Sequence, residues 1–355
     1  MDESKVNVAN REDNLSPVRD DRVSHFVEFK NVTNETFNPN GIANHVTEMT
    51  IIDSPLLTRI NNLPRQIQKL YITNTGLTVL ENLPEALIIL KCIRNSNLSA
   101  LPALPATLTE LICLYNNLTT LPSLPHLTEL YCDDNKLITL PDLPTTLSVL
   151  YCSNNKLSTL PELPADLQIF NCDNNLLTVL PELPENLSAF NCAGNKLTKL
   201  PNLPESLQQL LCDNNLITVL PDLPMYIENL ECQRNEELTS LPALPEYLSS
   251  LNCSYCNLAS LPLLPSELYS LRCVGNHLTE LPKLPRYLGE LDTSQNQLTV
   301  LPKLPKQLIK LDISRNQITT LPTLPNKLEI INYAQNPLQE AVILPPNTRI
   351  GFIYE

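Results

Sequence analysis

The chain has 355 residues, with 24 Lys and Arg against 38 Asp and Glu, and a net charge of −14. This acidic balance excludes functions that depend on binding a phosphate backbone, because nucleic-acid binding requires clustered Lys and Arg. The 32 Pro, 6 Gly and absence of Trp depart far from the composition of an average globular domain and indicate an internal repeat.

The amino-terminal residues 1–22 are polar and charged, which predicts a flexible tail. Ser16-Pro17 is the one place in it where a short helix could begin. No apolar core of a signal peptide follows Met1, and no window approaches the roughly 18 apolar residues of a spanning helix. We therefore expect neither a cleaved Sec signal peptide nor a transmembrane segment, and no membrane partner.

Residues 23–45 form a degenerate version of a repeat that becomes regular further along the chain, and they predict an amino-terminal capping unit. Phe26, Phe29, Asn34 and Phe37 fall at repeat spacing. In this register Asn31 takes the position that Cys occupies in later units.

Residues 46–345 repeat with a period of about 20, in the pattern L-x-x-L-x-C-x-x-N-x-L-x-x-L-P-x-L-P-x-x, with the first unit at Val46 and the fifteenth at Leu328. Alternation at the end of L-x-x-L-x-C predicts a short strand with Leu and Cys inward. The L-P-x-L-P segment predicts extended backbone, since Pro fixes φ and restricts its predecessor. The fold class predicted is a leucine-rich-repeat solenoid, a right-handed curved array of about 16 coils with a parallel concave sheet and an extended, polyproline-like convex face. Residues 346–355 are expected to cap the carboxyl end, with Ile353 at the Cys position.

Two polar residue types recur at fixed positions of the repeat. An Asn follows each strand, where its amide can bond the backbone of adjacent coils and leave no buried polar group unpaired. A turn irregularity is expected where Cys256 replaces this Asn. Ten other Cys take one inward position in successive coils, where a small apolar side chain fits: Cys92, Cys113, Cys132, Cys152, Cys172, Cys192, Cys212, Cys232, Cys253 and Cys273.

These ten thiols are spaced one per coil and lack the C-x-x-C pairing of zinc sites, so we expect neither a metal site nor a cofactor. Many buried free thiols are typical of a reducing compartment, which favours the cytoplasm. The four His are scattered along the chain, and no phosphate-binding glycine loop or nucleophile motif occurs. The sequence therefore predicts that the protein is not an enzyme.

The remaining feature is the outward surface of the predicted sheet, where exposed aromatic clusters mark interfaces. The predicted partner-binding residues are an apolar group of Ile112, Leu114, Tyr115, Tyr131 and Tyr151 and an acidic group of Asp133, Asp134, Asp173, Asp213 and Glu231. Residues 127–250 carry 17 acidic and 5 basic side chains, whereas residues 251–355 carry 8 and 9. A protein partner with a basic surface is therefore expected. The alternative reading of the tyrosines is that they stack only to stiffen the sheet.

The L-P-x-L-P-x-x-L-x-x-L-x-x-x-x-N-x-L frame resembles the bacterial LPX-type leucine-rich repeats of YopM-like effectors and of the IpaH ubiquitin-ligase effectors, over residues 46 to about 345. The resemblance implies an intracellular scaffold that binds host signalling proteins, located in the host cytoplasm after non-classical delivery. About seventeen residues follow Leu338, where the IpaH-like proteins continue into a ligase domain, so ligase activity is not expected. The alternative function is a structural or self-assembling repeat protein.

Overall fold

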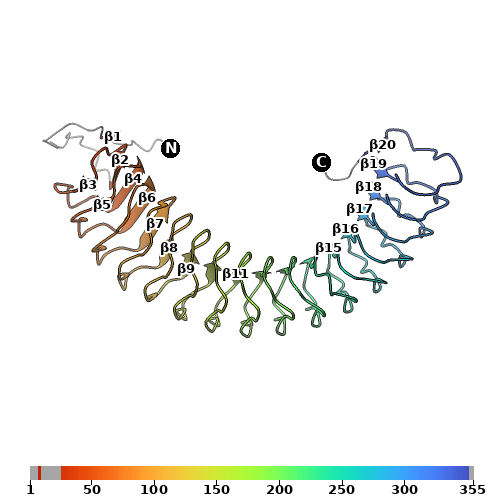
Figure 1. Cartoon of the computed structure of the whole chain (residues 1–355), viewed down its shortest axis with the longest axis horizontal. Coiled ribbons are helices and arrows are strands. Elements are labelled where there is room, and N and C mark those ends of the chain that lie inside the picture. The colour runs from red at the N-terminus through yellow and green to blue at the C-terminus, as the bar shows by residue number, and fades with distance from the viewer. Residues whose placement is uncertain (1–6, 9–24, 352–355) are drawn as a thin grey trace. The chain divides into compact units, whose positions relative to one another are not determined.

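The computed structural model describes residues 7–8 and 25–351. These residues belong to two compact units, unit 1 (residues 1–176) and unit 2 (residues 177–355). In each unit, successive coils of about 20 residues contribute one short strand apiece to a parallel sheet on their inner side (Figure 1). The described residues contain no helix. The predicted parallel-sheet solenoid of about 16 coils is confirmed.

In unit 1 the strands pair in parallel with the corresponding strand of the next coil, and a second, two-stranded sheet joins β3 to β5. The strands of this unit are β1 (Asn7–Val8), β2 (Phe26–Lys30), β3 (Thr36–Phe37), β4 (Glu48–Ser54), β5 (Arg59–Ile60), β6 (Lys69–Thr75), β7 (Ile89–Ile93), β8 (Glu110–Ile112), β9 (Glu129–Tyr131), β10 (Val149–Tyr151) and β11 (Ile169–Asn171).

Unit 2 continues the same pattern with strands of three residues and a final strand of two. They are β12 (Ala189–Asn191), β13 (Gln209–Leu211), β14 (Asn229–Glu231), β15 (Ser250–Asn252), β16 (Ser270–Arg272), β17 (Glu290–Asp292), β18 (Lys310–Asp312), β19 (Ile330–Asn332) and β20 (Arg349–Ile350). The register advances by one coil per strand, as in Leu271 opposite Leu291 and Leu291 opposite Leu311.

The core of each coil is made by the repeated apolar positions. In one coil Leu147, Leu150, Cys152 and Leu157 are all fully buried, whereas Tyr151 between two of them is only half-buried. The L-P-x-L-P segments are neither helix nor strand. Because each Pro lacks an N–H and cannot donate to a ladder, extended backbone closes the outer side of every coil.

The recurring Asn confirms its predicted structural role. Asn155 Oδ1 accepts the Leu137 N–H of the preceding coil at 2.9 Å, and Asn155 Nδ2 donates to the carbonyls of Cys132, Cys152 and Ser153 at 3.0 to 3.1 Å. One amide thus serves two coils at once. It satisfies backbone groups that neither the short strands nor the proline segments can pair.

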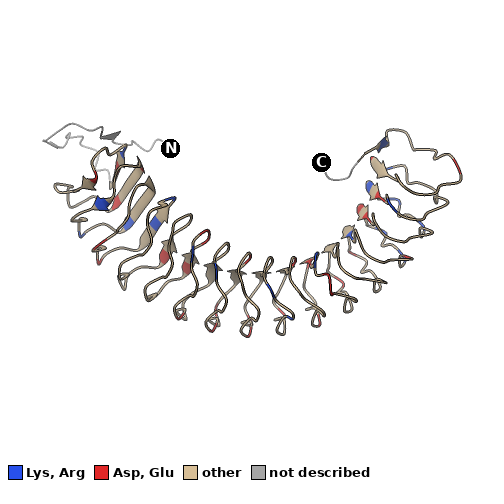
Figure 2. Cartoon of the chain, in the orientation of Figure 1, with Lys and Arg blue, Asp and Glu red and all other residues tan. Residues whose placement is uncertain are grey.

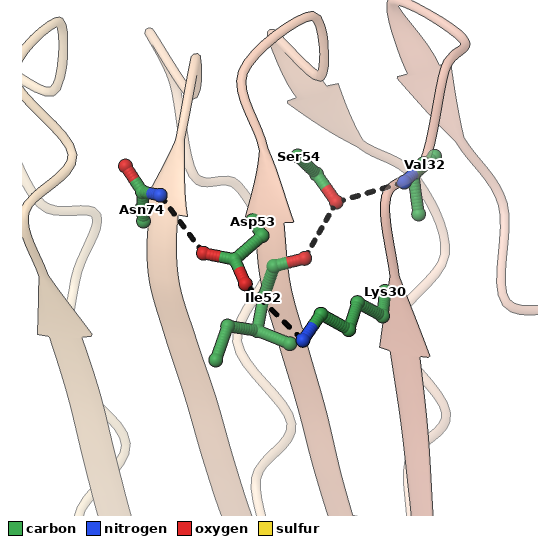
Figure 3. Close-up of polar contacts among 6 residues, drawn as sticks. All are labelled: Lys30, Val32, Ile52, Asp53, Ser54 and Asn74. Carbon is green, nitrogen blue, oxygen red and sulfur yellow. Dashed lines mark hydrogen bonds and ion pairs between the residues drawn. The ribbon is translucent and has the colours of Figure 1, made fainter. Parts of the chain in front are cut away.

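In the coil that begins at Val46, a hydroxyl replaces this amide. Ser54 Oγ accepts the Val32 N–H at 2.9 Å and donates to the Ile52 carbonyl at 3.0 Å (Figure 3). Beside it Asp53 accepts a hydrogen bond from Asn74 at 2.8 Å and pairs with Lys30 at 3.5 Å. The first coils are therefore joined by side chains at the carboxyl ends of their strands.

The amino-terminal capping register predicted from sequence is wrong by two residues. Phe29 pairs with Ile51, so Phe29 and not Asn31 occupies the Cys position. Phe29 is buried and packs edge-on against Phe37 at 4.6 Å, whereas Asn31 lies beyond β2 with a φ of 55°. The reason is physical, because an aromatic ring fills the interior whereas an inward amide would need buried partners.

The predicted flexible tail is described only at Asn7–Val8. These two residues form β1 and pair in parallel with Glu28 and Phe29 of β2, so at this point the chain adds a strand to the sheet. The helix predicted at Ser16-Pro17 and the inward position of Ile353 lie outside the described residues. Among those described, no helix has the length and apolar character that crossing a bilayer requires.

All eleven thiols are free and buried. The ten predicted column positions are fully buried or nearly so, and the Cys132 thiol donates to the Tyr151 carbonyl of the next coil at 3.3 Å. Cys256 stands in the Asn position, and its thiol donates to the Cys232 carbonyl at 3.4 Å. In the preceding coil Leu238 N–H bonds the Asn235 carbonyl at 3.0 Å. Leu98 N–H bonds the Asn95 carbonyl at 2.9 Å in the same way although the next coil keeps Asn116, so this turn reflects the extra residue in both coils and not the replacement by Cys256.

Native protein is expected to resist alkylation of its thiols at pH 8. Burial raises the pKa of Cys92 to about 12, so only about one molecule in ten thousand carries that thiolate. Mass spectrometry after iodoacetamide treatment should find at most Cys256 modified in native protein and all eleven thiols modified after unfolding without reductant. Several unmodified, disulfide-linked cysteines in the unfolded sample would contradict the prediction.

Candidate functional site

The predicted aromatic cluster lies on the sheet of unit 1. Ile112 of β8, Tyr131 of β9 and Tyr151 of β10 occupy equivalent positions on adjacent strands. The rings of Tyr131 and Tyr151 stack with centroids 5.2 Å apart and an interplanar angle of 20°. Tyr131 also donates to Glu129 at 3.0 Å. Burial first, and then this hydrogen bond, raise the pKa of Tyr131 to about 12. The stacking and this hydrogen bond therefore hold the two rings in one orientation.

Tyr115, the third predicted anchor, does not join this stack. It follows β8 with a φ of 55°, its side chain is half-exposed, and the Arg94 guanidinium of the preceding coil lies 5.7 Å from its ring. Leu114 precedes it and is partly exposed. Tyr115 therefore lies past the end of β8, apart from the stacked pair.

The acidic residues of unit 1 lie just beyond the strands. Asp133 Oδ1 accepts the Ser153 N–H of the next coil at 2.8 Å, and burial raises the pKa of the Asp133 carboxyl. Asp134 has a φ of 55°, and Asp173 accepts a hydrogen bond from Asn174 at 2.8 Å. These carboxylates border the stacked tyrosines on one edge of the sheet and give that edge negative charge.

Asp213 and Glu231 belong to unit 2. Asp213 accepts a hydrogen bond from Asn214 at 2.6 Å. Burial and the neighbouring Asp213 raise the pKa of the Glu231 carboxyl, while Arg272 opposes this effect. Both carboxylates are partly exposed and continue the acidic character of the sheet within their unit.

A hollow of about 290 Å³ on the sheet of unit 2 was not predicted. Asp292 and Asp312 are buried beside it, and each accepts hydrogen bonds from the serine two residues later, Ser294 and Ser314. Figure 2 shows acidic and basic residues close together on β16 to β18. The repeated D-x-S in successive coils is the sequence signal that could have indicated it.

The described residues contain no group of three His, Cys, Asp or Glu side chains arranged to hold a metal ion. The four His are scattered along the chain, as the sequence shows, but two of them meet in the structure. His25 Nδ1 lies 2.8 Å from the His45 carbonyl, and their rings meet edge-on at 6.3 Å. Both residues are exposed.

No family model and no curated protein matches the chain. Among solved structures, YopM from Yersinia enterocolitica is 30% identical over 93% of this chain and 92% of its own, with a TM-score of 0.59. YopM from Yersinia pestis, described as a leucine-rich effector protein, is 31% identical over 89% of each chain, with a TM-score of 0.68. A leucine-rich-repeat protein of Leptospira interrogans shares the fold at 22% identity and a TM-score of 0.59, over 92% of this chain and 95% of its own.

The likeness to the two YopM structures extends over almost all of both chains at 30 to 31% identity. The chain therefore belongs to the YopM-like family of bacterial leucine-rich-repeat proteins.

Proposed function

We propose that this protein is a non-catalytic scaffold that binds a protein partner through the inner face of its sheet. The observation that carries the proposal is the stacked Tyr131 and Tyr151 pair beside Ile112 on three adjacent strands. Rigid aromatic side chains lose little conformational entropy on binding and dominate interface energetics. They stand on short strands, and the recurring asparagines, called here the asparagine ladder, bond the residues that follow those strands to the neighbouring coil.

Charge supports a partner with a basic surface. Residues 127–250 carry a net charge of −12, and Asp133, Asp134 and Asp173 border the aromatic pair within unit 1. Such a field steers a basic partner toward the sheet and rejects an acidic one. The role follows that of YopM, which is described as an effector: we propose a host protein as the partner and the host cytoplasm as the compartment, in keeping with eleven free thiols.

Changing Tyr115, Tyr131 and Tyr151 together to Ala is expected to abolish partner capture and shift the melting temperature by only a few degrees. The rings are partly exposed, so their loss removes contact area for a partner but little of the core. Proximity labelling in a host cell, followed by pull-down of the labelled proteins with purified chain, measures the effect.

The matched control replaces two exposed apolar residues outside the strands, Ile138 and Leu263, with Ala. Their removal lowers surface hydrophobicity in the same way and should leave capture intact. If the tyrosine variant captures the same proteins as wild type, the inner face is not the binding surface. If light scattering instead shows an oligomer that the variant loses, the tyrosines serve self-assembly.

A further inference from the structure

Unit 2 exposes a second aromatic surface, just before the strands begin. Four tyrosines in successive coils lie where each coil turns into its strand: Tyr226, Tyr247, Tyr269 and Tyr287, called here the flank tyrosines. Their exposed fractions are 54%, 52%, 47% and 43%. Three of them immediately precede a fully buried apolar residue (Ile227, Leu248 and Leu288), and Tyr269 immediately follows one, Leu268. Since neighbours of an inward residue point outward, all four rings face away from the core.

The rings are held in fixed positions. Tyr226 and Tyr247 stack with centroids 5.7 Å apart and an interplanar angle of 24°. Tyr269 lies over the backbone of the next coil, where a Cβ added to Gly289 would come within 2.3 Å of its ring. The absence of a side chain at Gly289 is therefore what admits the ring. Because these half-exposed rings are already ordered, a partner that binds them loses little side-chain conformational entropy at this surface.

The last ring shows which chemistry the row accepts. The Arg286 guanidinium lies over Tyr287, with its Cζ 4.3 Å from the ring centroid. This is a cation–π contact, which a planar guanidinium makes by stacking on the ring face. Because Arg286 already covers the Tyr287 ring, the rings accessible to an outside ligand are those of Tyr226, Tyr247 and Tyr269.

The charge around the row points the same way. Residues 225–270 contain six acidic side chains and one basic one. Glu228, Glu246 and Glu267 are exposed next to the flank tyrosines in sequence, and none of the ion pairs among the described residues involves them. Aromatic faces flanked by carboxylates complement a cationic side chain and disfavour an acidic or nucleic-acid ligand.

We propose that the flank tyrosines bind arginine side chains of an extended segment of a protein partner. Three successive coils span about 10 Å across the strands, and Tyr269 lies two residues further along its coil than Tyr247, so the outer rings are about three to four extended residues apart. Two arginines separated by one or two residues therefore reach rings at both ends of the row, with the carboxylates beside them. This surface is separate from the inner-face tyrosines and does not depend on the function proposed for them.

The test uses the full chain and a synthetic twelve-residue Gly-Ser peptide with Arg at every second position, measured by fluorescence anisotropy at low and physiological salt. Changing Tyr226, Tyr247 and Tyr269 together to Ala should weaken binding more than tenfold. The matched change to Phe should keep the affinity within about threefold, because the ring face is retained. The same peptide with Lys in place of Arg should bind several-fold more weakly.

Four results would overturn the proposal. Equal affinity for the Arg and Lys peptides, unchanged in the Ala variant, would indicate general attraction to the acidic surface. Peptide binding could instead be lost in the Ala variant of Tyr115, Tyr131 and Tyr151 and kept in the flank variant. That result would place the peptide on the inner face and would support only the function proposed above. No binding at millimolar peptide, or a self-associated chain that the flank variant dissociates, would exclude an arginine-bearing partner at this surface.

Discussion

Raising the pH from 9 to 11 is expected to unfold the chain in a steep transition. Nine thiols of the buried column have a raised pKa, with burial as the main cause for eight of them. Unfolded thiols ionise near pH 8.5 to 9, so in this window the folded state holds more protons than the unfolded state. Each such thiol then lowers the free energy of unfolding by about 1.4 kcal/mol per pH unit, and together they lower it by on the order of 10 kcal/mol per pH unit.

That loss is as large as the whole stability of a typical domain. Urea denaturation at pH 7, 8, 9 and 10 measures it, since the stability from these groups is fully present below the unfolded pKa and falls as pH rises. The matched variant changes Cys132, Cys152 and Cys212 to Val. The column already admits branched residues at Ile72 and Ile313. The variant's alkaline midpoint should lie about half a pH unit higher, and an unchanged midpoint would show that the thiols do not control alkaline unfolding.

Replacing Asn155 with Leu is expected to lower the free energy of unfolding by about 3 to 6 kcal/mol. Leu has nearly the same shape, so the main change is the loss of the hydrogen bond accepted from Leu137 and of the two amide N–H donors that three backbone carbonyls share. A buried N–H and the carbonyls around it then lack their side-chain partner. Urea denaturation followed by circular dichroism measures the change.

The neighbouring Asn154 provides the control for that substitution. It is exposed, with a φ of 52°, so a change to Gly removes no ladder hydrogen bond and suits the left-handed backbone. Its effect should stay within about 1 kcal/mol. Equal destabilisation by the two changes would show that the asparagine ladder is not what joins the coils.

Much of the fold follows from the sequence because the repeat reports the same environment many times. The positions of Leu150, Cys152 and Asn155 recur so regularly that each new coil tests the assignment of the one before. The capping unit offers no such redundancy. Phe26 and Phe29 fit the repeat spacing in more than one register, and only the pairing of Phe29 with Ile51 decides between them.

The two proposed binding surfaces could be predicted from the sequence to a smaller extent. The alternation along each strand places Tyr131 and Tyr151 on one face, and the structure adds that they stack while Tyr115 contacts Arg94. The alternation along the strands did not predict the flank tyrosines, because they lie beside the first buried residue of the coil and not on the strand. Whether the Tyr269 ring reaches across to Gly289 depends on side-chain direction, which the spacing of residues does not determine.

The asparagine ladder also bears on how such a chain can change its length. Within unit 2 each Asn bonds only its own coil and the one before it, as Asn296 does with Leu278 N–H and the carbonyls of Cys273, Thr293 and Ser294. A genetic loss or duplication of one whole 20-residue segment leaves an equivalent donor and acceptor at the new junction. The array can therefore gain or lose coils in evolution without redesign of its core, while its exposed tyrosines and charges are brought into new combinations.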